Sequence, residues 1–334
     1  MVAPAQSSLS QLVPFRIDPV FTARVWGFRD LRPWYDRVAE TEPIGEVWLS
    51  GDECKIASGP HAGEKLGRLF ADAHDAMIGA KTPAGSPLLI KVIFARGKLS
   101  VQVHPDDKMA QKYGEPRGKT ECWYALEAEP GAKVAAGLKS GTTLEQVREE
   151  IAAGTLEASL NAVPIERGDM VFVDAGTVHA IWPGSILLET QQNSDITYRM
   201  FDYGRPRELH IEKSLEATKF GTHAGKVAPR RLPDRTVLIE AEYFRVEEIA
   251  MGGSRTSRSR TSLSLRGAGE SAGLSYLFAA AGVGRISGSG FEPVDLPARG
   301  IVAVPASSPE FVLEDASRSG EKLDLIRITP NWPS

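Results

Sequence analysis

Residues 99–108 read LSVQVHPDDK, and the first six of them alternate between apolar and polar side chains. In a β-strand successive side chains point to opposite faces, so Gln102 and His104 share one face and the apolar residues share the other. Donor side chains two residues apart on one strand are held rigidly and point the same way. The stretch therefore predicts a half-buried strand that presents Gln102 and His104 as candidate metal ligands.

Two further stretches add donors of the same kind. In GKTECWY (118–124), strand geometry places Lys119 and Glu121 on one face, and in GDMVFVDAGTVHAI (168–181) a strand and a tight turn precede His179. Two imidazoles, a carboxylate and an amide oxygen suit Zn²⁺ and also Mn²⁺, Fe²⁺ or Co²⁺. A set without thiolates favours an ion with an open position for substrate over a closed structural site.

The remaining patterns predict a mainly β chain with a small helical insertion. Thr143 to Gln146 forms a capping box, and the helical spacing that follows ends at Gly154. Shorter helices are expected near 64–71 and 107–113, the second capped by Asp106 and Asp107. Alternating or apolar runs beside turn residues predict further strands at 170–173, 186–189, 196–201 and 301–304.

Composition excludes several classes of protein. The 334 residues carry a net charge of −4, which gives no basis for nucleic-acid binding through bulk charge. No run approaches the ~18 apolar residues of a membrane span, and the N-terminal residues lack the pattern of a secretory signal. Two cysteines cannot form a disulfide framework, which favours a reducing compartment. We expect a cytoplasmic protein without a nucleic-acid or membrane partner.

The chain is expected to have two domains. All six histidines lie at or before residue 223, and the composition changes beyond that point. The segment GVGRISG (282–288) has the spacing GxGxxxG and lacks a βαβ context, so it does not indicate dinucleotide binding.

These stretches together resemble the two cupin motifs. The second motif fits from Gly168 to His179, whereas in the first Gln102 replaces a histidine and a longer segment separates His104 from Glu121. The resemblance implies two cupin-type antiparallel β-barrels (jelly-rolls). The expected divisions are an N-terminal tail (1–14), a catalytic metal-binding domain (15–223) with a helical insert around 140–160, and a C-terminal barrel without metal ligands (230–334).

The deviations from the general motif resemble the short bacterial form of type I mannose-6-phosphate isomerase. The matching segments also include TYRMFDYGR (197–205) and RELHIEKSLE (207–216). The resemblance implies reversible conversion of mannose 6-phosphate to fructose 6-phosphate through a cis-enediol, with one Zn²⁺ per chain. The family's metal ligands fall on Gln102, His104, Glu121 and His179, its catalytic arginine on Arg199 and its active-site lysine on Lys119.

Two other functions and several details stay open. A cupin oxygenase would hold Fe²⁺ at the same ligands, and a non-catalytic cupin would bind a sugar phosphate without turning it over. Lys91 stands in an otherwise apolar run, where it either faces the barrel interior or pairs with a carboxylate. The sequence assigns no general base, and both a monomer and a small homo-oligomer are compatible with it.

Overall fold

The computed structural model describes residues 10–79, 82, 85–249, 251, 273–318 and 321–331. The chain forms two compact units: unit 1 comprises residues 1–20, 49–87 and 229–334, and unit 2 comprises 21–48 and 88–228. Neither unit is continuous along the chain, which differs from the predicted domains at 15–223 and 230–334. The reason is strand pairing, since β1 (Phe15–Asp18) pairs with both β4 (Lys55–Ile56) and β21 (Ile301–Val304). Residues 1–9 of the expected tail lie outside the described residues.

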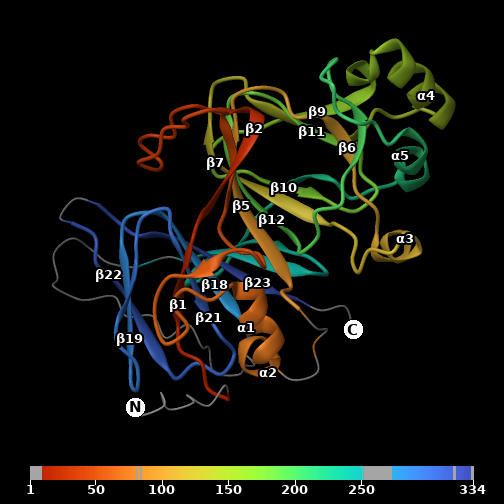
Figure 1. Cartoon of the computed structure of the whole chain (residues 1–334). Helices are drawn as coiled ribbons and strands as arrows, with labels where there is room; N and C mark the ends of the chain where they lie inside the picture. Colours follow the sequence, from red (N-terminus) through yellow and green to blue (C-terminus); the bar gives the residue numbers. More distant parts are fainter. Residues whose placement is uncertain are drawn as a thin grey trace. The chain divides into compact units, whose positions relative to one another are not determined.

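Unit 2 contains two antiparallel sheets (Figure 1). The seven-stranded sheet has the order β14 (Gly225–Val227), β10 (Met170–Val173), β7 (Glu121–Ala128), β12 (Ser185–Gln192), β5 (Leu88–Ala95), β3 (Ile44–Trp48), β2 (Val20–Phe28). The five-stranded sheet has the order β13 (Tyr198–Phe201), β6 (Val101–Val103), β11 (His179–Ile181), β8 (Lys133–Leu138), β9 (Leu160–Pro164).

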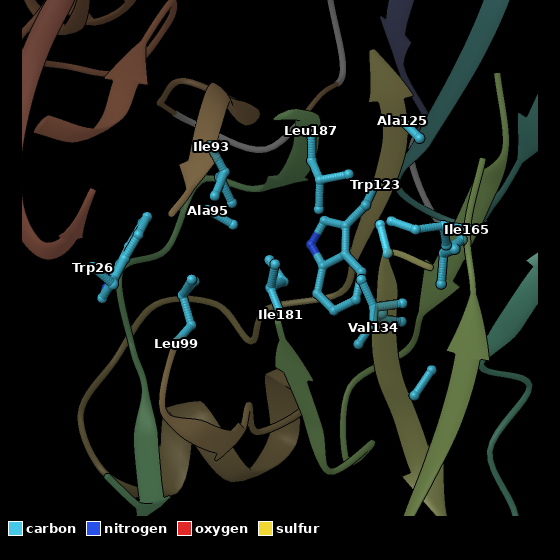
Figure 2. Packing of buried hydrophobic residues seen from close by; sticks show 14 residues of the cluster. Trp26, Ile93, Ala95, Leu99, Trp123, Ala125, Val134, Ile165, Ile181 and Leu187 are labelled. Atoms are coloured by element: carbon cyan, nitrogen blue, oxygen red, sulfur yellow. The ribbon is translucent and has the colours of Figure 1, made fainter. Parts of the chain in front are cut away.

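The two sheets of unit 2 enclose an apolar core between them. Trp123, Ile93 and Leu187 come from the seven-stranded sheet, and Val134 and Ile181 come from the five-stranded sheet (Figure 2). Each of these side chains is at most 3% exposed, so the inner faces of both sheets are removed from water. Other inward-facing positions on these strands carry the polar residues described below.

The outer face of the five-stranded sheet is covered as well. A second apolar cluster joins Val101 and Val103 of β6 to residues of α4 (Leu144–Ala153), α5 (Ile211–Ala217) and the short helix η1 (Leu156–Ser159). Helices α4 and α5 lie on the same side of the unit as α3 (Asp107–Lys112) (Figure 1). The predicted alternation holds within β6, where Val101 and Val103 enter the outer cluster and Gln102 lies on the opposite face. For Leu99 the prediction is wrong: this residue precedes β6, and its side chain packs in the inner core (Figure 2).

Unit 1 is also mainly β. Its eight-stranded sheet has the order β15 (Arg230–Arg231), β16 (Arg235–Glu240), β17 (Phe244–Ile249), β23 (Asp324–Pro330), β18 (Ser275–Ala281), β21, β1, β4. Its three-stranded sheet has the order β20 (Val294–Leu296), β19 (Gly284–Gly288), β22 (Phe311–Asp315). Both sheets contribute to one apolar cluster, and α1 (Leu66–Asp72) and α2 (His74–Met77) precede the crossing into unit 2.

The predicted elements are largely confirmed. The strands at 170–173 and 301–304 have those bounds, the strand at 186–189 extends over β12, and those at 99–104 and 196–201 shorten to β6 and β13. Helix α4 begins after the Thr143 cap and ends at Gly154, whose φ is +72°. The prediction that Asp107 is a helix cap is wrong: Asp106 caps α3, whereas Asp107 accepts hydrogen bonds from Gly118 and Gln192.

No helix in the described part of the chain is both long enough and apolar enough to cross a membrane.

Candidate metal centre

A tight turn between β10 and β11 delivers His179 to the inner face of unit 2. Gly176 in this turn has a φ of +94°, a conformation that glycine adopts without steric cost. The Gly176 N–H donates to the carbonyl of His104 at 2.8 Å, which joins the two histidine segments directly. The Nδ1 of His179 lies 2.8 Å from the Thr177 carbonyl, so this nitrogen carries the proton and Nε2 keeps its lone pair.

Strand register aligns three of the predicted residues in one row. Gln102 on β6 pairs with His179 on β11 on one side and with Arg199 on β13 on the other. Residues directly opposite one another in an antiparallel sheet point to the same face. Gln102, His179 and Arg199 therefore share the inner face, and His104 follows two residues after Gln102.

Glu121 enters from the other sheet at the first position of β7. The end of the preceding loop is held in place, because the Lys119 N–H donates to the carbonyl of Pro105 at 3.0 Å and the Thr120 N–H donates to Oε1 of Gln192 at 2.9 Å. Glu121 is fully buried. A loop that is fixed in this way positions the carboxylate opposite the two histidines.

His104, Glu121 and His179 form a compact buried triad with the dimensions of a metal site. Their donor atoms all lie within 4.8 Å of one another. Oε1 of Glu121 is 3.5 Å from Nε2 of His179, and Oε2 is 3.6 Å from Nε2 of His104. Two atoms bound at about 2.0–2.2 Å to a tetrahedral ion lie about 3.3–3.6 Å apart. The observed spacings therefore match a shared ion.

Hydrogen bonding supports the same interpretation. Within the described residues, Oε1 of Glu121 and Nε2 of His179 are buried without a hydrogen-bond partner, whereas Oε2 of Glu121 lies 3.2 Å from Nζ of Lys119. Buried acceptors without a donor are rare and destabilising, and two that lie 3.5 Å apart form a ready site for a cation. The donor set fits a divalent metal ion.

The lowered pKa values of both histidines favour the neutral form that binds a metal ion. Burial lowers the pKa of His179 to about 4, and burial together with the charge of Lys119 lowers the pKa of His104 well below its ordinary value. Burial raises the pKa of Glu121 to about 7, although the neighbouring Lys119 opposes that shift. Both imidazoles are therefore neutral at pH 7, and neutral imidazole is the form that binds metals.

The structure brings Lys119 to the triad and places Arg199 along the row. Nζ of Lys119 lies 3.1 Å from Nε2 of His104 and 3.2 Å from Oε2 of Glu121. Arg199 is half-buried, and its Nη1 donates to the carbonyl of Glu208 at 2.7 Å. Burial and the nearby Arg207 lower the pKa of Arg199.

Lys91 and Glu189 form a buried ion pair on the inner face of the seven-stranded sheet, which also carries Glu121, and only Lys91 was singled out from the sequence. Lys91 is opposite Glu189, and Glu189 is opposite Trp123, so the three side chains share the inner face. Nζ of Lys91 lies 3.2 Å from Oε2 of Glu189, and Trp123 Nε1 donates to Oε1 of Glu189 at 3.1 Å. Glu189 was not among the residues predicted from the sequence, although a carboxylate in an apolar strand was the available signal for a partner of Lys91.

Comparisons with known proteins agree with this architecture. A family model for the phosphomannose isomerase type I catalytic domain matches residues 15–138. Mannose-6-phosphate isomerase from Streptococcus mutans is 36% identical over 245 residues, which cover 69% of this chain and 77% of that protein. Mannose-6-phosphate isomerase ManA from Bacillus subtilis is 35% identical over 256 residues, which cover 72% and 80%.

Solved structures extend the similarity to nearly the whole chain. The mannose 6-phosphate isomerase from Bacillus subtilis aligns with a TM-score of 0.81 at 27% identity, covering 95% of this chain and 99% of that one. A zinc-bound mannose 6-phosphate isomerase has the same fold, with a TM-score of 0.74 at 16% identity over 96% of this chain and 100% of that one. Fold and site together define a metal-binding protein of the cupin type. The chain belongs to the type I phosphomannose isomerase family.

Proposed function

We propose that the protein is a metal-dependent mannose-6-phosphate isomerase that interconverts mannose 6-phosphate and fructose 6-phosphate through a cis-enediol. The observation that carries the proposal is the buried triad of His104, Glu121 and His179, with its unpartnered lone pairs beside Lys119. Membership of the family and the isomerase names of the relatives support this function, and those comparisons give no support to the oxygenase or to the non-catalytic binding protein.

The proposed ligands are Gln102, His104, Glu121 and His179, holding one Zn²⁺ per chain. The three triad residues supply neutral nitrogen and carboxylate donors, and Gln102 lies beside His179 in the sheet. The bound ion would supply Lewis acidity toward the oxygens on C1 and C2, which stabilises developing negative charge by several kcal/mol.

Lys119 and Arg199 are the proposed catalytic residues. Lys119 is a buried amine whose Nζ lies 3.1 Å from Nε2 of His104 and 3.2 Å from Oε2 of Glu121, so it can orient a substrate hydroxyl or carry a proton there. Arg199 adds a fixed positive charge with planar donors, which suits an enediolate oxygen or a phosphate. The charge of Arg199 would be complementary to the doubly anionic sugar phosphate.

Proton transfer between C1 and C2 also requires a group that accepts a proton and returns it. Lys91, Glu189 and Lys119 are titratable side chains on the inner face near the triad, and we propose that the base is one of these residues or water. Lys91 and Glu189 form a buried ion pair, so a proton transfer at one of them shifts the pKa of the other.

Unit 2 is the proposed catalytic and metal-binding part, because it contains all of these residues. We propose a cytoplasmic enzyme whose partner is the small sugar phosphate, acting as a monomer or small homo-oligomer without a nucleic-acid or membrane partner. Cys54 and Cys122 are buried and are not joined in a disulfide, which is consistent with a reducing compartment.

The function is tested by a coupled assay of fructose 6-phosphate formation from mannose 6-phosphate. The assay is run on protein as purified, after chelation, and after return of Zn²⁺. Activity should disappear with chelator and return with metal. H179A and E121Q should lose about 10³-fold or more, because several kcal/mol of transition-state stabilisation correspond to that factor. H223A removes a side chain that is 91% exposed and serves as the control.

Each alternative has a distinct result. Oxygen consumption with Fe²⁺ and an unphosphorylated substrate would identify an oxygenase. Binding of mannose 6-phosphate to metal-loaded protein without turnover would identify a binding protein, and either result would overturn the isomerase proposal.

A further inference from the structure

Gln191 is a buried residue beside the metal triad to which no role has been given. It lies on β12 directly opposite Glu121 on β7, two residues after Glu189, and it is fully buried. Cross-strand neighbours have Cβ atoms about 4.5–5.5 Å apart and point to the same face. The Gln191 side chain therefore leaves the sheet next to the carboxylate of the triad.

The amide of Gln191 has a defined orientation. Its Nε2 donates to the carbonyl of Gln192 at 3.1 Å and to the carbonyl of Ser194 at 2.5 Å. Rotating the amide by half a turn would place its oxygen against two other oxygens, so the nitrogen and oxygen positions are determined by these contacts. Both amide hydrogens are used, and only the oxygen remains available for another interaction.

That oxygen lacks a partner. Oε1 of Gln191 is buried and accepts no hydrogen bond from the residues that the structure describes. Two charged donors near this face are already paired, Lys119 with His104 and Glu121, and Lys91 with Glu189. A fixed, buried acceptor beside the reaction centre is suited to a ligand that brings its own donor, such as a hydroxyl group.

The next residue provides a contrast. Gln192 uses both ends of its amide within the protein, since Oε1 accepts from the Thr120 N–H at 2.9 Å and Nε2 donates to Oδ1 of Asp107 at 2.9 Å. Gln192 therefore positions the loop that carries Lys119, and its hydrogen bonds are complete without a ligand. Of two consecutive glutamines, only Gln191 keeps an open acceptor.

We propose that Gln191 is a specificity-determining residue whose Oε1 accepts a hydrogen bond from the C3 hydroxyl of the bound sugar phosphate. The inference rests on the proposed function, in which C1 and C2 lie at the metal. C3 carries the first hydroxyl outside the reacting pair, and Gln191 is the first neighbour of Glu121 on β12. A neutral acceptor suits this position, because another carboxylate there would repel Glu121 and the phosphate.

The test is a binding experiment on the zinc-loaded full chain, so it does not depend on turnover. Titration calorimetry compares mannitol 6-phosphate, which has no carbonyl to react, with its 3-deoxy and 4-deoxy forms. The wild type should bind the parent about tenfold tighter than the 3-deoxy form, the size expected for one buried hydrogen bond. The 4-deoxy form should lose less than threefold.

Variants then assign this preference to Gln191. Q191M should bind the parent and the 3-deoxy form equally, whereas Q192M should retain the tenfold ratio even if its overall affinity falls. A purely structural role for Gln191 would weaken both ligands alike and leave the ratio unchanged. Bound zinc is measured in every variant, so loss of metal is separated from loss of the hydrogen bond.

The wild-type comparison needs no variant and is decisive if Q191M fails to fold. Equal binding of the parent and 3-deoxy ligands by the wild type, or no binding of either, overturns the proposal for Gln191. The proposed function is judged separately by turnover of mannose 6-phosphate: turnover without C3 discrimination refutes only the role of Gln191, and C3 discrimination without turnover refutes only the isomerase.

Discussion

Replacing Lys91 with methionine removes the cation from a buried group of acids on the inner face of unit 2. The side chains of Lys91 and Glu189 are 4% and 5% exposed, and their charged atoms lie 3.2 Å apart. Burial acts to lower the pKa of Lys91, but Glu189 and Glu46 together raise it, so the lysine is charged in the folded protein. In K91M the Glu189 carboxylate would remain buried with its hydrogen bond from Trp123 as compensation.

Breaking a buried ion pair on one side costs about 3–5 kcal/mol. At roughly 2–4 °C per kcal/mol for a unit of this size, the melting temperature of K91M should fall by about 6–20 °C. The double variant K91M/E189Q should recover most of the loss, because a neutral amide can still accept from Trp123 without an unpaired charge. Thermal and urea unfolding of the zinc-loaded protein, followed by circular dichroism, measure both variants.

A matched control exists in the same unit. Lys98 and Glu157 form an ion pair at 2.7 Å, but their side chains are 44% and 35% exposed. Exposed pairs contribute about 0–1 kcal/mol, so K98M should melt within a few degrees of the wild type. A K91M variant as stable as K98M, or a double variant no more stable than K91M, would refute the account of a buried and mutually dependent pair.

Three further outcomes are expected. The pKa of Glu121 in the metal-free protein is raised to about 7, so zinc must displace a proton from this carboxyl group below that pH. The dissociation constant of zinc should therefore rise about tenfold per pH unit from 7 to 5.5 and level off above 7.5. Competition titrations with a chromogenic chelator measure this constant, and a flat profile would show that the carboxylate is not a ligand. G176A should lower stability by about 1–3 kcal/mol and weaken zinc binding, because the new Cβ would meet Lys219 at 2.6 Å and the backbone φ is +94°. G141A is the control: its φ is +85° and no described atom lies within 4 Å, so it should cost about 1 kcal/mol and leave zinc affinity unchanged. Equal zinc affinity in both variants would contradict the role of the turn. R199K should reduce kcat/KM about 10–100-fold with normal zinc content, because an ammonium lacks the planar pair of donors, and unchanged kinetics would exclude the proposed role of the guanidinium.

Local sequence patterns were enough to predict several of the helices and strands. The alternation correctly assigned Val101 and Val103 to one face, because side-chain direction within a strand depends only on position along the chain, but it failed for Leu99, which lies outside the strand. The capping box at Thr143 and the glycine at 154 located α4, because caps are interactions within a few residues. Asp107 shows the limit of this reasoning, since its partner Gly118 belongs to a loop that local rules do not place against α3.

The candidate site was only partly accessible in the same way. Motif spacing selected His104, Glu121 and His179, and the structure groups their donor atoms in one buried cluster. Their convergence depends on contacts between segments, such as the hydrogen bond from Gly176 to the carbonyl of His104. A period of two residues indicates which face a side chain occupies, but it does not indicate which strand lies alongside.

What the sequence determined by itself was therefore the type of the predicted elements, the faces of residues within a strand and the chemistry of the proposed ligands, because these follow from local geometry and from the side chains present. Tertiary structure alone decided the register that pairs Lys91 with Glu189, the open acceptor of Gln191, and the pairing of β1 with β21 that makes both units discontinuous. These features arise from pairings between distant segments, whose free energy depends on the packing of the whole unit and on no short stretch of the chain.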